Sequence, residues 1–424
     1  MKRTVAVVGT LDTKGPEYRF LLGCLRHHGL DPVVIDISLR RSDPGFDVHH
    51  SVDDVAGRAG AEYRSVAALN KGEAGKIMAA GARAIVQEMQ RDGRLAGIIA
   101  LGGANGTILC GEIMKSLPVH LPKLIVCVVA AADPRVNVGT KDIVLVNAIS
   151  DMCLNRLTGR IIANAAAAFA GMILLPPAPV ADSRRRLVGA TMLGLDERFV
   201  SGVKRGVEQG PYEVVVFHAN GVGGLALEGM LEEDLLEGIL DLTLNEPLNH
   251  LLGGVFDAGP GRLDAALEKG LPMVIAPGCT DFVNFWGRNI PAHVQDRIFY
   301  FHNTQNTLMR SAPEETFRCG GWVGEKLNGT RAPVKVLVPL LGVSALDREG
   351  GAHGQTVDGR DAGPWHRPEA VQAFADGLRR SVSSPRVDVV TLQAHINDEP
   401  FARAVAGAFL DAMAAAPSPR AERG

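Results

Sequence analysis

The stretch VVGTLDTKG (residues 7–15) places two hydroxyls, a carboxylate and an amine in one loop that two glycines bound. It is not a P-loop, because its lysine comes before the second glycine and no hydroxyl residue follows. Thr10, Thr13 and Lys14 would instead offer two hydroxyls and a positive charge to phosphate oxygens. Asp12 would bind Mg²⁺ directly or through water. The alternative is an Asx-type turn beside a solvated lysine.

GGANGT (residues 102–107) is the best phosphate cradle in the chain. Its three glycines let the backbone approach an anion closely, and a helix that begins near Thr107 would aim free N–H groups at it. The spacing is G-G-x-x-G, so it matches the dinucleotide fingerprint G-x-G-x-x-G only in part. A plain strand-to-helix turn is the alternative. HANGVGG (residues 218–224) has the same character, and VGTKDI (residues 138–143) repeats the Gly-Thr-Lys theme.

The residues of these loops that we expect to bind a nucleotide are Gly9, Thr10, Asp12, Thr13, Lys14, Gly102, Gly103, Asn105, Gly106, Thr107, Gly139, Thr140, Asn220, Gly221, Gly223 and Gly224.

Candidates for catalysis are fewer. Cys279 and Asp281 lie in the loop APGCTD, which follows an apolar run, and His395 follows the last apolar run of the chain. The alternatives are an inert loop cysteine and a buried histidine that orients its loop. The histidines show neither H-x-H nor H-E-x-x-H spacing, which argues against a zinc site.

Composition argues against several classes of partner. The 424 residues are 46% apolar and 21% charged, and their net charge of −3 gives no electrostatic case for nucleic acid or a membrane surface. Six scattered cysteines without a C-x-x-C fit a reduced, cytoplasmic setting. The charge-free stretch at residues 161–181 is expected to be a buried helix that leads into a linker, because two prolines stop it after about four turns.

The elements that must position these residues form an α/β pattern. Continuous Val/Ile runs, such as those at residues 97–103 and 123–130, predict parallel strands that are covered on both faces. Their alternation with helical stretches predicts right-handed crossovers and doubly wound parallel sheets. In such sheets a ligand binds outside the carboxyl ends of the strands, at the point where the strand order reverses.

The second half of the chain repeats the plan of the first, because four of its apolar segments echo four earlier ones in the same order. These pairs are RLVGATMLGLD with RTVAVVGTLD, YEVVVFHAN with DPVVIDIS, EGILDLTL with AGIIALGG, and LPMVIAPGCTD with LPKLIVCVVAAAD. We therefore expect two Rossmann-like domains, residues 1–180 and 181–424, whose sheets face an interdomain cleft. The glycine-rich, polar segment at residues 347–365 is expected to be a long mobile loop.

Several stretches together resemble the Tm-1-like ATP-binding family, which contains the inhibitory domain of the tomato mosaic virus resistance protein and many bacterial relatives. The stretches include VVGTLDTKG, IALGGANGT, VGTKDI, VFHANGVGG, VIAPGCTDFVNF, GVSALD and AHIND. The resemblance spans almost the whole chain. It implies a two-domain α/β protein that binds ATP and forms a homodimer or higher homo-oligomer; it does not carry over viral inhibition.

We therefore expect a cytoplasmic protein that holds ATP, with Mg²⁺, on the glycine-rich loops. One alternative is a ligase-like or lyase-like enzyme that acts on a small acid in the interdomain cleft with Cys279, Asp281 or His395 in the chemistry. Another is a non-catalytic interaction module that ATP merely orders. Fold alone does not decide among them.

Overall fold

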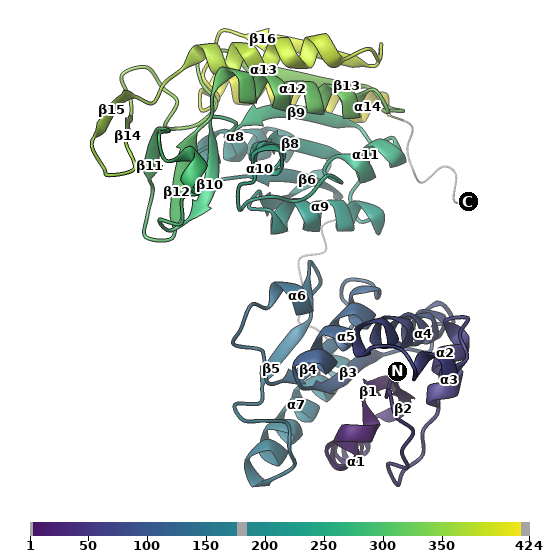
Figure 1. Ribbon diagram of the computed structural model, residues 1–424. Coiled ribbons are helices and arrows are strands. Elements are labelled where there is room, and N and C mark those ends of the chain that lie inside the picture. Colours follow the sequence, from purple (N-terminus) through teal and green to yellow (C-terminus); the bar gives the residue numbers. More distant parts are fainter. Residues whose placement is uncertain (1–2, 176–184, 417–424) are drawn as a thin grey trace. The chain divides into compact units, whose positions relative to one another are not determined.

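The chain divides into two compact units, Met1–Asp182 and Ser183–Gly424. The computed structural model describes residues 3–175 and 185–416 (Figure 1), and each unit is taken by itself. The predicted domain boundary between residues 180 and 181 lies outside the described residues.

Unit 1 is built on a parallel sheet with the order β2-β1-β3-β4-β5. Its strands are β1 (Thr4–Gly9), β2 (Asp31–Asp36), β3 (Gly97–Gly102), β4 (Lys123–Cys127) and β5 (Val144–Asn147). Its helices are α1 (Leu11–His27), α2 (Val52–Arg58), α3 (Tyr63–Val66), α4 (Lys71–Arg91), α5 (Ala104–Lys115), α6 (Arg135–Val138) and α7 (Arg156–Leu174). The helices cover both faces of the sheet, as predicted (Figure 1).

The apolar runs of the unit 1 strands divide their side chains between two cores. In β1, Ala6 and Val8 pack with α2, α3, α4 and α5, whereas Val5 and Val7 pack with α1 and α7. Successive strand residues point to opposite faces. Both faces are dry, which is why these strands show continuous apolar runs and no alternation with polar residues.

Unit 2 contains a six-stranded parallel sheet with the order β16-β13-β9-β8-β6-β7. These strands are β6 (Arg186–Met192), β7 (Tyr212–His218), β8 (Ile239–Thr243), β9 (Met273–Gly278), β13 (Val334–Pro339) and β16 (Val387–Leu392). Helices α8 (Glu197–Val207) and α14 (Glu399–Ala415) cover one face. The other face packs α9 (Val222–Glu232), α10 (Asn245–Leu252), α11 (Asp264–Lys269), α12 (Pro313–Leu327) and α13 (Pro368–Ser381).

The internal repeat is visible in the topology. In both sheets the first strand of the unit lies between the second and the third, and the fourth follows the third. The four matched sequence pairs correspond to β1 with β6, β2 with β7, β3 with β8, and β4 with β9. The two-domain, doubly wound α/β fold is therefore confirmed.

Unit 2 also contains an antiparallel sheet that the sequence patterns did not predict. Its order is β10-β12-β11-β14-β15. The strands are β10 (Phe282–Trp286), β11 (Phe299–Phe301), β12 (Asn306–Arg310), β14 (His353–Gln355) and β15 (Asp361–Pro364). The last two form a hairpin inside the segment expected to be a long mobile loop, so that prediction is wrong. Trp365, which ends the segment, is fully buried and fastens it to the protein.

Helix α7 carries the charge-free stretch. Of the helices that the structure describes, it is the one long and apolar enough to cross a membrane by length and composition. In unit 1, however, its residues Ile162, Ala166 and Phe169 are fully buried against the sheet and α1. The helix thus supplies one wall of the core, but its other side is exposed, so the buried-helix prediction holds for one side only. The linker predicted to follow it, residues 176–181, lies outside the described residues.

Candidate functional site

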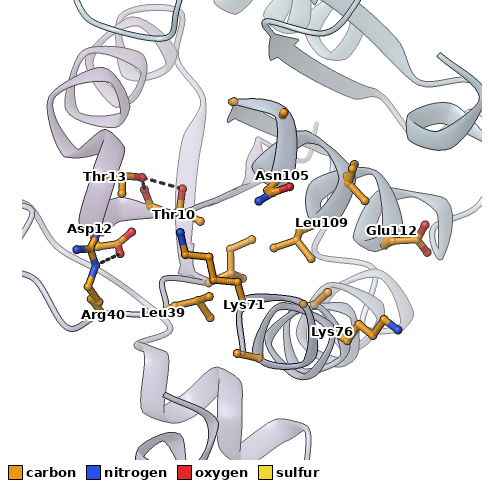
Figure 2. Close-up of a pocket in the computed structure, with 18 of the residues that line it drawn as sticks. Thr10, Asp12, Thr13, Leu39, Arg40, Lys71, Lys76, Asn105, Leu109 and Glu112 are labelled. Carbon is orange, nitrogen blue, oxygen red and sulfur yellow. Dashed lines mark hydrogen bonds and ion pairs between the residues drawn. The ribbon is translucent and has the colours of Figure 1, made fainter. Parts of the chain in front are cut away.

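A cavity of unit 1 lies where its strand order reverses. The chain leaves β1 toward β2 through α1, on one face, and leaves the adjacent β3 toward β4 through α5, on the other face. Ligands of doubly wound sheets bind at this switch point. A cavity of about 1040 Å³ opens there. It is lined by residues that follow β1, β2 and β3, and by one side of α4 (Figure 2).

The N-terminus of α5 presents free amide groups to this cavity. Within the described residues, the N–H groups of Ala104, Asn105 and Gly106 donate no hydrogen bond. Thr107 begins the internal bonding of the helix, because its N–H and its hydroxyl both donate to the Gly103 carbonyl, at 2.9 and 2.7 Å. Free N–H groups at a helix N-terminus attract anions. Thr107 itself is fully buried and closes the turn.

The three glycines of GGANGT differ in whether the fold requires glycine at their positions. A Cβ on Gly102 would lie 2.7 Å from the Thr107 amide nitrogen, so the fold requires glycine there. A Cβ on Gly103 or on Gly106 would meet nothing within 4 Å. Neither residue has a positive φ. The fold therefore does not explain these two glycines, whereas close approach of a ligand to the helix end would.

The loop after β1 contributes polar groups to the cavity. The Thr10 and Thr13 hydroxyls lie 3.2 Å apart. The Asp12 N–H donates to the Ser38 hydroxyl at 3.0 Å, and the Asp12 carboxylate lies 3.4 Å from Arg40, whose side chain is 77% exposed. The Lys14 amine donates to the Met152 carbonyl at 2.6 Å, so it tethers a neighbouring loop although the residue lines the cavity.

Gly9 lies beneath the cavity and does not line it. It is buried, and a Cβ there would collide with the Tyr18 hydroxyl. That hydroxyl lies 2.7 Å from the carbonyl oxygens of both Val8 and Leu101, and it accepts from the Leu101 N–H at 2.9 Å. Burial raises the pKa of Tyr18 well above its ordinary value, so the hydroxyl stays neutral. Tyr18 thus ties β1 to β3 under the site.

Asp12 is the one carboxylate of the segment after β1 that lines the cavity, and a metal ion there would need further ligands from a bound molecule. No group of three or more His, Cys, Asp or Glu side chains gathers among the described residues, so a metal cage made of protein alone is absent from them. Mg²⁺ is often held by one or two carboxylates together with phosphate oxygens and water. Asp12 supplies one such carboxylate at the edge of the cavity.

Gly139 and Thr140 lie away from this cavity. Gly139 has a φ of +54°, and a Cβ there would approach the Lys115 side chain at the C-terminal end of α5. Neither Gly139 nor Thr140 lines the cavity. The structure therefore does not bring these two residues to the site that Gly103 and Gly106 line.

In the glycine loop of unit 2, a carboxylate of the protein itself occupies the position expected for a bound anion. The N–H groups of Gly221 and Gly224 donate to the Glu246 carboxylate at 2.7 and 2.9 Å. Glu246 is fully buried and bonds Arg262 at 2.8 Å. The Gly223 N–H donates to the Asn220 side chain at 3.3 Å. Gly221 and Gly224 thus donate to a protein carboxylate and Gly223 donates to Asn220, so these groups are already paired inside unit 2, which corrects the assignment of the four residues to a phosphate site.

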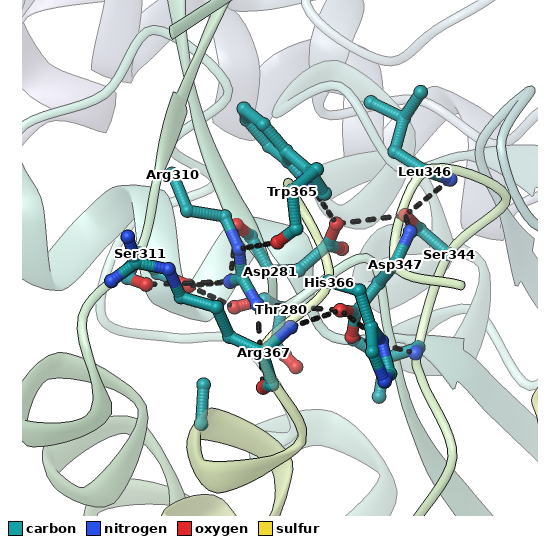
Figure 3. Close-up of polar contacts among 12 residues, drawn as sticks. Thr280, Asp281, Arg310, Ser311, Ser344, Leu346, Asp347, Trp365, His366 and Arg367 are labelled. Atoms are coloured by element: carbon teal, nitrogen blue, oxygen red, sulfur yellow. Dashed lines mark hydrogen bonds and ion pairs between the residues drawn. The ribbon is translucent and has the colours of Figure 1, made fainter. Parts of the chain in front are cut away.

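Asp281 and His395 meet at Ser344 inside unit 2. The Ser344 hydroxyl donates to Asp281 at 2.8 Å, as does the Trp365 indole N–H, also at 2.8 Å (Figure 3). Burial and the neighbouring Asp347 raise the pKa of Asp281 to about 6. The His395 ring donates through Nε2 to the Ser344 carbonyl at 3.0 Å. Burial and nearby Arg348 lower the pKa of His395.

Cys279 follows β9 with a φ of +56° and is fully buried. Burial and the adjacent Asp196 raise its pKa well above the ordinary value, so it remains a thiol. Asp281 and His395 are at most 2% exposed. All three catalytic candidates are thus enclosed, and the contacts of Asp281 and His395 fasten the loops that follow β9, β13 and β16. This agrees with the alternatives of an inert cysteine and an orienting histidine.

Two family models divide the chain between them. The N-terminal domain of the uncharacterised protein family UPF0261 matches residues 3–177, and the C-terminal domain of that family matches residues 185–413. The chain belongs to the UPF0261 family. The UPF0261 proteins of Clostridium tetani and Rhizobium meliloti are each 35% identical to it over 97% of this chain, and over 100% and 99% of their own lengths.

The UPF0261 chain is also similar to two tomato proteins. The ToMV resistance protein Tm-1 and the ToMV susceptible protein tm-1 of Solanum lycopersicum are each 33% identical over 96% of this chain and 55% of their own lengths. The resemblance drawn from the sequence motifs is therefore confirmed at the level of the family.

The cations of α4 are the part of the UPF0261 site that sequence reasoning missed. Lys71, Lys76 and Arg83 line the cavity, and in the described part of the chain none of them forms an ion pair. Figure 2 shows the Lys71 side chain reaching from α4 toward the loop that carries Thr10. The sequence contains little to indicate these cations as site residues, because single cations spaced along a helix usually indicate a solvated face.

Proposed function

We propose that this UPF0261 protein binds ATP, together with Mg²⁺, in the switch-point cavity of unit 1. The observation that carries the proposal is the free N-terminus of α5, with two glycines that the fold does not require, at the place where doubly wound sheets bind ligands. The cavity is also cationic. Five Lys and Arg side chains line it, against two carboxylates: Lys14, Arg40, Lys71, Lys76 and Arg83, against Asp12 and Glu112.

In this arrangement the phosphates occupy the α5 N-terminus. The free N–H groups of residues 104–106 donate to phosphate oxygens, the Thr10 and Thr13 hydroxyls add further donors, and Lys71 adds charge from α4. Asp12 would supply a carboxylate ligand to the Mg²⁺ that accompanies the phosphates. Apolar side chains from the β2 loop and from the segment before α4, Ile37, Leu39 and Leu69, offer a surface for the base.

The structure gives less support to the alternative functions. Cys279, Asp281 and His395 are enclosed in unit 2 and line no part of this cavity. The tomato relatives named for resistance and for susceptibility to ToMV match this chain equally well. Similarity to them therefore argues for the shared fold and gives no ground for proposing an antiviral role here.

Calorimetric titration of the full chain with Mg-ATP tests the proposal. We expect heat of binding and a rise in melting temperature, because a ligand at one hundred times its dissociation constant adds about 2.7 kcal/mol to the stability of the native state. Adenosine, which lacks phosphates, should bind much more weakly. Absence of both heat and thermal shift with Mg-ATP would refute the proposal.

Replacement of Asp12 by asparagine tests the role of the metal. In the wild-type protein, Mg²⁺ should strengthen ATP binding. In Asp12→Asn, the affinity in Mg²⁺ should fall about tenfold, to a value close to that measured in excess EDTA, because the amide is a poorer ligand for Mg²⁺. An unchanged Mg²⁺ dependence would show that Asp12 is not the metal ligand.

A further inference from the structure

The switch-point cavity is large for a ligand pocket. Its volume of about 1040 Å³ lies just above the range of roughly 300–1,000 Å³ that is usual for such pockets. Thr10 and Asp12 lie at one side in Figure 2, and Lys76 and Glu112 lie at the opposite side, beyond Asn105. The cavity therefore continues from the phosphate end into a groove between α4 and α5.

One face of α4 forms a wall of this groove. Gly72, Lys76, Ala79 and Arg83 all line the cavity, and their spacing of i, i+4, i+7 and i+11 places them on the same side of the helix. From Gly72 to Arg83 the wall is about 16 Å long. The two small residues leave room for a ligand.

The facing wall comes from α5, through Ile108, Leu109 and Glu112. Leu109 also holds the two helices together, because its side chain lies 3.2 Å from where a Cβ on the buried Gly75 would be. The groove thus combines an apolar lining with the cations Lys76 and Arg83. Those cations form no ion pair among the described residues, whereas Glu112 is already paired with Lys115.

We propose that the ligand is an adenine nucleotide whose diphosphate carries a long, flexible arm that ends in an acidic group. The inference rests on the proposed function, since the diphosphate occupies the α5 N-terminus. From there the arm runs along the groove beside Ala79 and Ala80, and its acidic end meets Lys76 and Arg83. An acyl derivative of coenzyme A with a free carboxylate has this chemistry.

The length of the arm is tested by comparing ADP with dephospho-coenzyme A in titrations of the full chain. We expect dephospho-coenzyme A to bind at least tenfold more tightly than ADP, because it has an arm that enters the groove and ADP has none. The variant Ala80→Leu fills the groove and should abolish this advantage while leaving ADP affinity unchanged. Ala167→Leu, on the exposed side of α7, is the matched control and should change neither affinity.

The acidic end of the arm is tested with succinyl-coenzyme A and acetyl-coenzyme A. The succinyl ligand should bind about tenfold more tightly to the wild-type protein, and Arg83→Gln should remove most of that preference. Arg91→Gln, near the end of the same helix and outside the cavity, should preserve it.

The outcomes separate this inference from the proposed function. If ATP and ADP bind but the arm adds no affinity, or if Ala80→Leu leaves its contribution intact, the groove is not an arm site and nucleotide binding stands. If the arm contributes to affinity but the succinyl and acetyl ligands bind equally tightly, the proposal that the arm ends in an acidic group is wrong. If neither ATP nor ADP binds, the proposed function fails and this inference fails with it.

Discussion

Gly106 is a position where the proposed ligand site and the stability of the fold favour different residues. It lies in the first turn of α5 with helical backbone and open space around its missing side chain. Glycine is less favourable than alanine in a helix by roughly 0.5–1 kcal/mol, so the protein forgoes stability at this position. Nothing in the packing accounts for that loss, whereas phosphate oxygens against the backbone would.

Gly106→Ala should therefore raise stability and lower nucleotide affinity at once. We expect the free energy of unfolding to rise by up to about 1 kcal/mol, and Mg-ATP affinity to fall about tenfold, because the methyl group intrudes where the phosphates lie. Urea unfolding and calorimetry measure the two effects. Gly23→Ala, at an open, exposed position on α1, is the control and should change stability alone. Unaltered ATP affinity in Gly106→Ala would contradict the placement of the phosphates.

Asp281 illustrates the opposite case, a buried acid that the fold keeps partly protonated. One carboxylate oxygen accepts from Ser344 and Trp365, and the other has no hydrogen-bond partner among the described residues. Burial and Asp347 raise the pKa of Asp281 to about 6, above its unfolded value. Its contribution to stability is therefore fully present at low pH and is lost as pH rises through about 6.

Asp281→Asn should stabilise the protein at pH 8. The amide oxygen still accepts from Ser344 and Trp365, and no charge remains for Asp347 to repel. Urea unfolding at pH 5 and pH 8 should show a smaller loss of stability on raising the pH than in the wild-type protein. The exposed Asp411→Asn serves as the control and should follow the wild-type pH dependence. A variant less stable than wild type at pH 8 would show that the ionised carboxylate is the stabilising form.

Helices α5 and α9 both begin at a glycine-rich turn, but the N–H groups at their N-termini have different partners. Each follows a strand at the carboxyl edge of its sheet through a glycine-rich turn. The amides of α5 are free, whereas those of α9 donate to Glu246. Glu246 bonds Arg262, which also contacts Asp241 through two bonds of 2.9 Å. The same local pattern therefore gives an open anion site in one unit and a closed structural cap in the other.

Removal of the cap should unfold unit 2 more easily. Glu246→Ala leaves the N–H groups of Gly221 and Gly224 unpaired in the interior and deprives Arg262 of a partner. Breaking one side of a buried ion pair costs about 3–5 kcal/mol, which urea unfolding would reveal. Glu232→Ala, at an exposed position on α9, should cost less than about 0.5 kcal/mol. Equal stability of the two variants would show that the cap contributes nothing.

At the scale of the whole molecule, the two units have separate interiors. Within residues 3–175 and 185–416, each buried hydrophobic cluster consists of residues from one unit: two clusters belong to unit 1 and three belong to unit 2. The proposed ligand site is in unit 1, and the buried acids Asp196 and Asp281 are in unit 2. Burial also raises the pKa of Asp196, to about 7. The ligand should therefore act on unit 1, whereas lowering the pH from 8 to 6 should act most strongly on unit 2, which contains the two acids with the highest pKa values.

We expect calorimetric melting of the full chain to resolve two transitions. Mg-ATP should raise only the one that belongs to unit 1. Lowering the pH from 8 to 6 should raise the one that belongs to unit 2, because Asp196 and Asp281 take up protons more readily when folded. Glu246→Ala identifies the unit 2 transition independently. A single transition that responds to both conditions would show that the units unfold cooperatively.

The sequence by itself determined the fold class and the internal repeat, because continuous apolar runs and glycine turns are local signals that tertiary contacts seldom override. It also drew attention to Gly103 and Gly106, which line the cavity of unit 1. It did not predict the antiparallel sheet, whose strands of three to five residues carry little periodic signal.

Only the tertiary structure decided which glycine loop is open. HANGVGG and GGANGT look alike in sequence, and the carboxylate that closes the first comes from Glu246, more than twenty residues further along. The cations of α4 likewise join the site through packing against α5. Whether an amide faces a ligand or a side chain depends on what packs beside it, and that partner is set by the fold and not by the local sequence.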